Sequence, residues 1–149
     1  MTVMISDRLP AGTVQAEKSG DYSYDVNDDG TVTIRRYTGS ATYTDTAVII
    51  PEALDGKKVT GIGGYAFRDC YNMISITIPS SVTSIGGEAF YNCGKLTSIT
   101  IPSGVTSIEG EVFAGCGGLT SITIPSGVTS IGEGAFSGCS SLTSITLPS

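Results

Sequence analysis

The sequence predicts a solenoid, in which a unit of 23 residues containing a short β-strand stacks on copies of itself behind a separate N-terminal cap. Two observations lead to this prediction. Cysteine, phenylalanine and proline each recur four times at intervals of 23 residues, and residues 102–124 and 125–147 are identical at 15 of 23 aligned positions. A fixed period of about 20 to 50 residues is typical of stacked supersecondary units that share one continuous core.

A strand opens each repeat, as residues 96–102 illustrate. Residues 98–101 alternate polar and apolar side chains, which predicts a half-buried strand, and Pro102 ends it because proline has no N–H to donate. Residues 105–108 add two inward-facing positions, and residues 110–116 fit a helical or 3₁₀ turn that returns the chain to the next strand. We therefore expect a parallel β-sheet on the concave face and short turns on the convex side.

The motifs within the repeat are specific. They combine into L-x-x-I-x-I-P-x-x-V-x-x-I-x-x-x-A-F-x-x-C, with Ala-Phe-x-x-Cys at 89–93 and 135–139 and valine in place of that alanine at 112. Over about residues 46–149 this pattern resembles the BspA-type (Treponema pallidum-type) leucine-rich repeat. The resemblance implies a leucine-rich repeat solenoid of about four and a half rungs. It also implies a bacterial cell-surface protein that binds host matrix proteins or other cells.

The first repeat is longer than the others. Pro51 precedes Val59 by eight positions, whereas Pro79 precedes Val82 by three, so the first repeat carries a five-residue insertion near residues 53–57. Asp-Gly at 55–56 is a favourable turn sequence. We expect the insertion to form a surface turn.

The residues before 46 do not repeat. Alternating apolar residues at 22–26 and 32–34 flank Asn-Asp-Asp-Gly at 27–30, which predicts a β-hairpin. We assign residues 21–45 to an N-terminal β-hairpin cap and residues 1–20 to a non-repeating arm or linker. The last repeat ends without a distinct cap. Residues 1–20 and this uncapped C-terminal rung are the expected contacts of a homo-oligomer or an assembly.

Composition excludes several functions. Eight basic and 14 acidic side chains give a net charge of −6 and a pI near 4.4, which argues against binding nucleic acid. Without histidine, a Ser-His-Asp triad cannot form. Glu109 and Glu111 are the remaining carboxylate pair, and both fall in an expected surface turn. We predict a protein that is not an enzyme and uses no cofactor.

The route of the chain to its site of action stays open. No stretch reaches the 18 or so apolar residues of a membrane helix, and residues 1–11 lack the apolar core of a secretory signal. Location at the cell surface or outside the cell would then require an export signal that has been removed. The alternative is synthesis in the cytoplasm without export, as for an intracellular protein or a structural component of a phage virion docked by residues 1–20.

The four cysteines are expected to be buried core thiols. They occupy one position of the repeat beside phenylalanine and leucine, and free cysteine is among the most buried residue types. Side chains stacked at one repeat position point the same way, which disfavours disulfides. The cysteines also cannot surround a zinc ion tetrahedrally.

Outward-facing hydroxyls are the candidate binding residues. Where the isoleucines of a strand point inward, the serine and threonine between them point outward. The predicted ligand-binding face is Ser75, Thr77, Ser98, Thr100, Ser121, Thr123, Ser144 and Thr146. Its expected partner is a protein or a cell-surface ligand. The alternative interpretation is a solubilising sheet surface, with threonine present for its β-propensity.

A calcium-dependent binding module is a further alternative. Asp25, Asn27 and Asp29 match the opening of an EF-hand loop, followed by Gly30. The twelfth position is Arg36, where the loop requires glutamate, and strands instead of helices are expected on both sides. A hairpin turn explains the same residues. Apart from this candidate, we predict no metal site.

Overall fold

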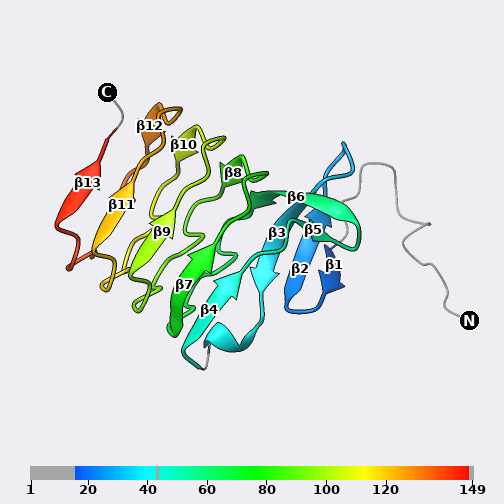
Figure 1. Ribbon diagram of the computed structural model, residues 1–149, viewed down its shortest axis with the longest axis horizontal. Helices are drawn as coiled ribbons and strands as arrows, with labels where there is room; N and C mark the ends of the chain where they lie inside the picture. The colour runs from blue at the N-terminus through cyan, green and yellow to red at the C-terminus, as the bar shows by residue number, and fades with distance from the viewer. Residues whose placement is uncertain (1–15, 43, 148–149) are drawn as a thin grey trace, which may run out of the picture.

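A computed structural model shows an elongated stack of chain coils in which parallel strands follow one another from the cap toward the last repeat (Figure 1). The structure describes residues 16–42 and 44–147. Five strands form the main sheet, in the spatial order β13-β11-β9-β7-β4. They are β4 (Thr46–Ile49), β7 (Met73–Thr77), β9 (Ser98–Thr100), β11 (Ser121–Thr123) and β13 (Ser144–Thr146). The predicted solenoid of 23-residue repeats with a parallel sheet is confirmed.

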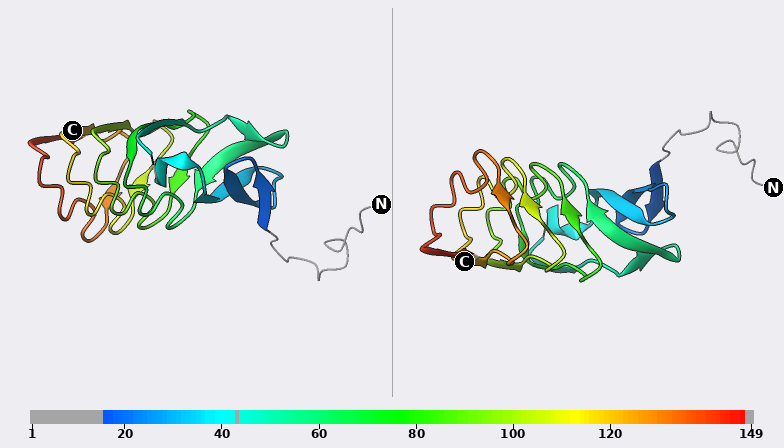
Figure 2. Two further views of the ribbon diagram at one scale, coloured as in Figure 1. Left: turned by 90° about the horizontal axis from the view of Figure 1, so that it is seen from below. Right: turned by 90° about the horizontal axis from the view of Figure 1, so that it is seen from above.

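A second row of short strands lies along another side of the stack (Figures 1 and 2). This row comprises β6 (Lys57–Ile62), β8 (Ser84–Ile85), β10 (Ser107–Ile108) and β12 (Ser130–Ile131). β6 pairs with β8, and β10 pairs with β12, in parallel register. Each complete coil therefore contains two strands, one in each row.

An arc of turns closes each coil, and its backbone hydrogen bonds alternate in direction. In the arc at 88–93, Phe90 and Asn92 donate their N–H groups to Val112 and Ala114 of the next repeat, at 3.0 and 2.8 Å. Tyr91 and Cys93 instead donate to residues three positions earlier, at 3.1 and 3.3 Å. The arcs thus consist of single turns with the i→i−3 hydrogen bonds of a 3₁₀ turn, as expected from the sequence, and these turns also pair with the next repeat. This alternation of hydrogen bonds joins the repeats and also gives the buried backbone N–H and C=O groups their partners.

Two positions of every arc have positive φ. The first is held by Tyr65, Glu88, Glu111 and Gly134, and the second by Asp69, Asn92, Gly115 and Gly138. The φ values of the non-glycine residues lie between 56° and 64°. An L-residue in this conformation costs about 1 kcal/mol or more. The later repeats relieve this strain with glycine, whereas the earlier ones retain side chains there.

Ladders of identical residues fill the core. Phe67, Phe90 and Phe113 are fully buried, and successive rings from Phe67 to Phe136 stack with centroids 5.5, 5.6 and 5.7 Å apart. The ring of Tyr37 from the cap stacks on Phe67 at 5.3 Å. The aromatic stack therefore runs without interruption from the cap into the repeats, and stacked aromatic pairs add to the energy of burial.

The cysteines form a parallel ladder beside the rings. All four are free thiols; three are buried, and Cys139 is half-buried. Cys93, Cys116 and Cys139 each donate to the carbonyl of the phenylalanine 26 positions earlier, at 3.1 to 3.2 Å. The prediction that the thiols belong to the core is confirmed for Cys70, Cys93 and Cys116.

The cap is a three-stranded antiparallel unit joined to the second row of strands. Its strands are β1 (Ala16–Ser19), β2 (Tyr22–Val26) and β3 (Val32–Tyr37), followed by the 3₁₀ helix η2 (Ser40–Thr42). The β2–β3 hairpin has the predicted turn, and β3 runs parallel to β6.

The N-terminal boundary of the cap requires a correction. Residues 16–19, which the sequence analysis placed in the arm, form β1 and pair antiparallel with β2. Ala-Glu-Lys-Ser at these positions does not alternate apolar and polar side chains, so the sequence did not predict a strand there. Residues 1–15 lie outside the described part of the chain, so docking through the arm stays a prediction.

The insertion in the first repeat folds as a small hairpin. β5 (Ala53–Leu54) pairs antiparallel with the start of β6, and the turn is Asp55-Gly56, as predicted. Both turn residues have positive φ, 49° and 77°, which is the geometry of a type I′ turn.

The last described strand exposes apolar side chains. Ile145 is 37% exposed and Leu147 is 60% exposed. Beside them, Ile124, Val128 and Ile131 contribute to a shallow pocket of about 220 Å³. Phe136 and Leu142 remain packed against the core.

Candidate functional site

The predicted hydroxyl face lies on the main sheet, where the register aligns it. Ser75, Ser98, Ser121 and Ser144 are consecutive partners, and we call them the serine row. Thr100, Thr123 and Thr146 are likewise aligned. With Thr77 at the corresponding position of β7, they form the threonine row. Seven of these eight side chains are exposed and Ser75 is half-buried. The structure therefore brings the predicted residues together on one face.

The hydroxyls of the two rows are not used in the hydrogen bonds of the described fold. None of the eight makes a hydrogen bond with a described residue, although both donor and acceptor capacity is present in each. None of the five strands of the sheet contains a charged residue. The face is thus polar but uncharged, with hydroxyls repeated at the spacing of parallel strands, about 4.8 Å.

Sequence reasoning missed a third row of threonines on the same sheet. The Oγ1 atoms of Thr120 and Thr143 donate to the backbone carbonyls of the residue one repeat earlier, at 3.3 and 3.4 Å. Their backbone N–H groups donate to the same carbonyls. These hydroxyls therefore strengthen the contact between repeats. The recurring Leu-Thr-Ser-Ile sequence was the feature from which this third row could have been predicted.

The two rows end in apolar residues at the cap. Ala47 is the partner of Ser75, and Ile49 is the partner of Thr77. Ile49 is 73% exposed, and Ile74 on the next strand is 40% exposed. The sheet face therefore changes from hydroxyl to aliphatic along its length, which the repeat pattern alone did not predict.

A second hydroxyl-bearing surface follows the other row of strands. Thr83 and Thr129 donate through backbone N–H to Thr60 and Thr106, both at 2.9 Å, and their hydroxyls approach the same carbonyls at 3.5 and 3.4 Å. In this row Ser107 donates to the Glu109 carboxylate at 2.7 Å. These hydroxyls make hydrogen bonds within the protein, in contrast to those of the serine and threonine rows.

The calcium candidates have other partners in the β2–β3 turn. Asp25 pairs with Arg35 at 3.5 Å, and the Asn27 amide donates to Thr31 at 2.9 Å. Asp29 accepts from both the N–H and the hydroxyl of Thr31, at 3.0 and 2.6 Å, and these bonds lower the pKa of the Asp29 carboxyl. Strands flank this turn on both sides. The geometry is that of a hairpin closed by its own side chains.

An aromatic cluster covers the arcs of the first two complete repeats. The guanidinium of Arg68 lies over the rings of Tyr65 and Tyr91, at 5.4 and 4.9 Å from their centroids, and pairs with Glu88 at 3.4 Å. Cation–π stacking of this kind holds an arginine in place. Tyr65 and the neighbouring Tyr71 are 48% and 53% exposed. The cluster lies on the arcs, away from the hydroxyl rows.

Within the described residues, no three histidine, cysteine or acidic side chains gather as a metal site. No helix among them is long and apolar enough to span a membrane. Glu109 and Glu111 are both exposed. The described surfaces therefore offer recognition by hydroxyl, aliphatic and aromatic groups.

Stacked 23-residue coils with an open, uncharged sheet face define a β-solenoid repeat protein. A model of the BspA-type leucine-rich repeat region matches residues 46–149 in six copies, and the chain belongs to this family. No curated protein sequence matches the chain.

Solved structures support the assignment. The Treponema pallidum leucine-rich repeat protein is 30% identical with a TM-score of 0.70, and the match covers 88% of this chain and 72% of that one. A leucine-rich repeat protein of Bacteroides capillosus is 29% identical with a TM-score of 0.74, over 90% and 99% of the two chains. A leucine-rich cell-surface protein of Faecalibacterium prausnitzii is 33% identical with a TM-score of 0.69. That match covers 93% of this chain but only 44% of the longer protein.

Proposed function

We propose that the chain is a non-enzymatic recognition or adhesion module, which binds a protein or a cell-surface ligand through the serine and threonine rows of the main sheet. One observation carries this proposal. Eight hydroxyls stand in register on an open sheet without hydrogen-bond partners among the described residues, whereas the hydroxyls of Thr120 and Thr143, just before the same strands, join repeats.

Physical reasoning favours a macromolecular ligand on this face. The rows present many weak, repeated donors and acceptors over a long surface, and solenoids commonly use such extended faces for binding. Exposed Ile49 and Ile74 at one end add an apolar contact, which can contribute more affinity than the hydroxyls. A ligand that follows several strands would bind through the sum of these contacts.

Location at the cell surface is part of the same proposal. The F. prausnitzii relative is described as a cell-surface protein, and this chain shares 33% of its aligned residues with it. Adhesion to matrix proteins or to other cells would be consistent with that location.

A binding assay with one variant on each face tests the proposal. Immobilised fibronectin, fibrinogen, laminin and collagen serve as probes, and intact cells as a further one. Thr100→Arg places a long cationic side chain at the centre of the threonine row. Ser130→Arg makes the same change at an exposed position of the second strand row. We expect wild type to bind at least one probe, and Thr100→Arg to weaken that binding about tenfold or more.

Ser130→Arg should bind like wild type, and both variants should keep the thermal unfolding midpoint of a folded repeat array. Equal affinity of the two variants would contradict a binding role for the main sheet. The absence of binding to every probe by the wild type would contradict the adhesion proposal itself.

A further inference from the structure

Strand β6 changes its partner halfway along its length. Lys57 and Lys58 pair with β5, whereas Gly61 and Ile62 pair with β8 of the next repeat. Val59 lies between these two stretches. Its N–H donates to the Glu52 carbonyl at 2.9 Å, and its carbonyl accepts from the Ser81 hydroxyl at 2.7 Å. β5 and the segment that leads to β8 therefore separate at this point.

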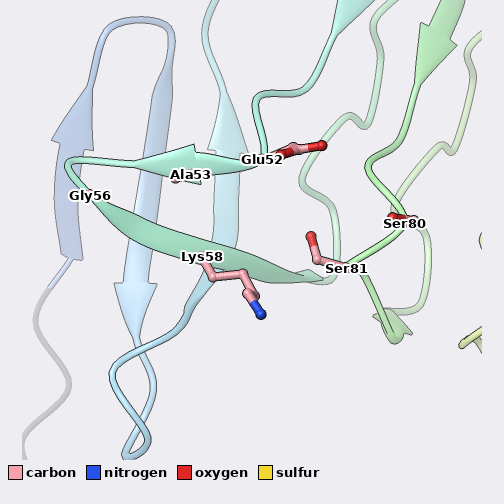
Figure 3. Close-up of a pocket in the computed structure, with 6 residues that line it drawn as sticks. All are labelled: Glu52, Ala53, Gly56, Lys58, Ser80 and Ser81. Atoms are coloured by element: carbon pink, nitrogen blue, oxygen red, sulfur yellow. The ribbon is translucent and has the colours of Figure 1, made fainter.

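A pocket of about 470 Å³ lies where these two segments separate (Figure 3). Its lining residues are Glu52, Ala53, Gly56, Lys58, Ser80 and Ser81. Small-ligand sites have volumes of about 300 to 1,000 Å³. The pocket is therefore large enough for a ligand of several residues.

The hairpin wall of the pocket is fixed in place by the cap. Leu54 is buried in the core, and the adjacent Asp55 carboxylate accepts hydrogen bonds from Tyr24 at 2.6 Å and from Ser19 at 3.0 Å. These two bonds, with that from Tyr24 the stronger influence, lower the pKa of Asp55. A ligand would thus meet a wall that is already ordered, which reduces the entropy lost on binding.

The same wall is the insertion that departs from the 23-residue period. Where the first repeat has the β5–β6 hairpin, the later repeats have short Ser-Gly turns at 103–104 and 126–127. In repeat proteins, insertions of this kind map to loops on one face, which is often the binding face. The insertion supplies Ala53 and Gly56 of the six lining residues, and Glu52 and Lys58 flank it on either side.

Opposite charges line the pocket without partners of their own. Glu52 and Lys58 form no ion pair with any described residue. In Figure 3 the Glu52 carboxylate extends from the residue just before β5 toward the side of the pocket that holds Ser80 and Ser81, and Lys58 extends separately from β6. The Ser81 hydroxyl donates to Val59, so its oxygen retains acceptor capacity, and Ser80 has its full capacity.

We propose that this pocket binds a small zwitterion of the amino acid or short peptide class. Its ammonium group would pair with Glu52, and its carboxylate would pair with Lys58 and accept from Ser80. Each of these contacts is a charge-assisted hydrogen bond, which is the stronger kind. This site is separate from the serine and threonine rows, so the result of its test does not depend on the adhesion proposal.

Amide chemical shifts of the whole chain, measured during titration with trialanine, test the proposal. We expect saturable shifts at the lining residues with millimolar affinity. N-acetyl-trialanine lacks the ammonium group and trialanine amide lacks the carboxylate, so each should bind about fivefold or more weakly. Glu52→Gln should abolish the preference over the acetylated probe, and Lys58→Gln the preference over the amide.

Lys57→Gln and Glu17→Gln are the matched controls, because they remove one charge of each sign from residues of the same region that do not line the pocket. Both should retain the wild-type preferences, and the spectra themselves report whether each variant is folded. Equal affinities for the three probes would overturn the proposal, as would the lack of any saturable shift at the lining residues.

Discussion

The cap with its first repeat and the repeats that follow are stabilised in different ways. Residues 1–69 hold seven of the eight basic side chains, and the described part of this region contains single, specific contacts such as Tyr24 to Asp55. From residue 70 onward the structure relies on ladders of identical side chains, and from Gly115 on glycine occupies the strained arc positions. Regular repeats build the stack, and departures from regularity create distinctive surfaces.

The largest expected effect comes from breaking a ladder. Phe90→Ala removes a fully buried ring between Phe67 and Phe113 and leaves a cavity that neighbouring repeats cannot close. We expect a loss of about 3–5 kcal/mol in the free energy of unfolding, measured by urea denaturation. Phe136→Ala should cost clearly less because that ring is only partly buried. Equal losses would show that the ladder does not depend on neighbours on both sides.

A smaller effect is expected from a specific contact of the cap. Tyr24→Phe removes the hydroxyl that donates to Asp55 at 2.6 Å, and we expect a loss of about 1–2 kcal/mol in urea denaturation at pH 7. Tyr22→Phe is the matched control, because its hydroxyl makes only a 3.5 Å contact with Ile49. Its loss should be less than half as large, and equal losses would contradict the role of the Asp55 bond.

The same variant gives a defined pH dependence. The bond to Asp55, with burial, raises the pKa of Tyr24 from 10.0 to about 12, so its contribution is complete below pH 10 and is lost as the pH rises through 12. The pKa of Asp55 is lowered from 3.8, so its contribution is present above that value and is lost as the pH falls through the lowered pKa. The difference in stability between wild type and Tyr24→Phe should therefore shrink at both extremes.

The smallest expected effect is a gain in stability. Glu111→Gly places glycine at an arc position with a φ of 56°, where Gly134 already serves in the next repeat. Relief of the strain exceeds the entropy that glycine loses on folding, so we expect a gain of about 0.5 kcal/mol in thermal unfolding. Glu133→Gly, at a position with ordinary φ, should lose about 0.5–1 kcal/mol. A loss at Glu111 would contradict the strain argument.

Periodicity made most of the fold predictable. A repeat of 23 residues reveals core positions, strands and the insertion at once, because every position is sampled several times along one sequence. The hydroxyls of Ser98 and Thr100 could be placed on the outer face for the same reason. The turn at Asp55-Gly56 followed from its residue types.

Single contacts between distant segments were not predictable. The bond of Tyr24 to Asp55 joins residues 31 positions apart and has no counterpart in another repeat. The positive φ of Tyr65 could not be predicted from the sequence, because tyrosine does not favour this backbone conformation. The pocket beside Lys58 depends on where β6 changes partner, which only the three-dimensional pairing reveals.

The alternating hydrogen bonds of the arcs have an evolutionary consequence. Each arc donates to the next repeat in the same pattern in which it accepts from the previous one, as Phe90 to Val112 and Phe113 to Ala135 illustrate. A gene segment encoding one whole repeat can therefore be duplicated or deleted by recombination in register, and both new junctions remain compatible. Array length, and with it the reach of the binding face, becomes a trait that selection can adjust without inventing a new interface.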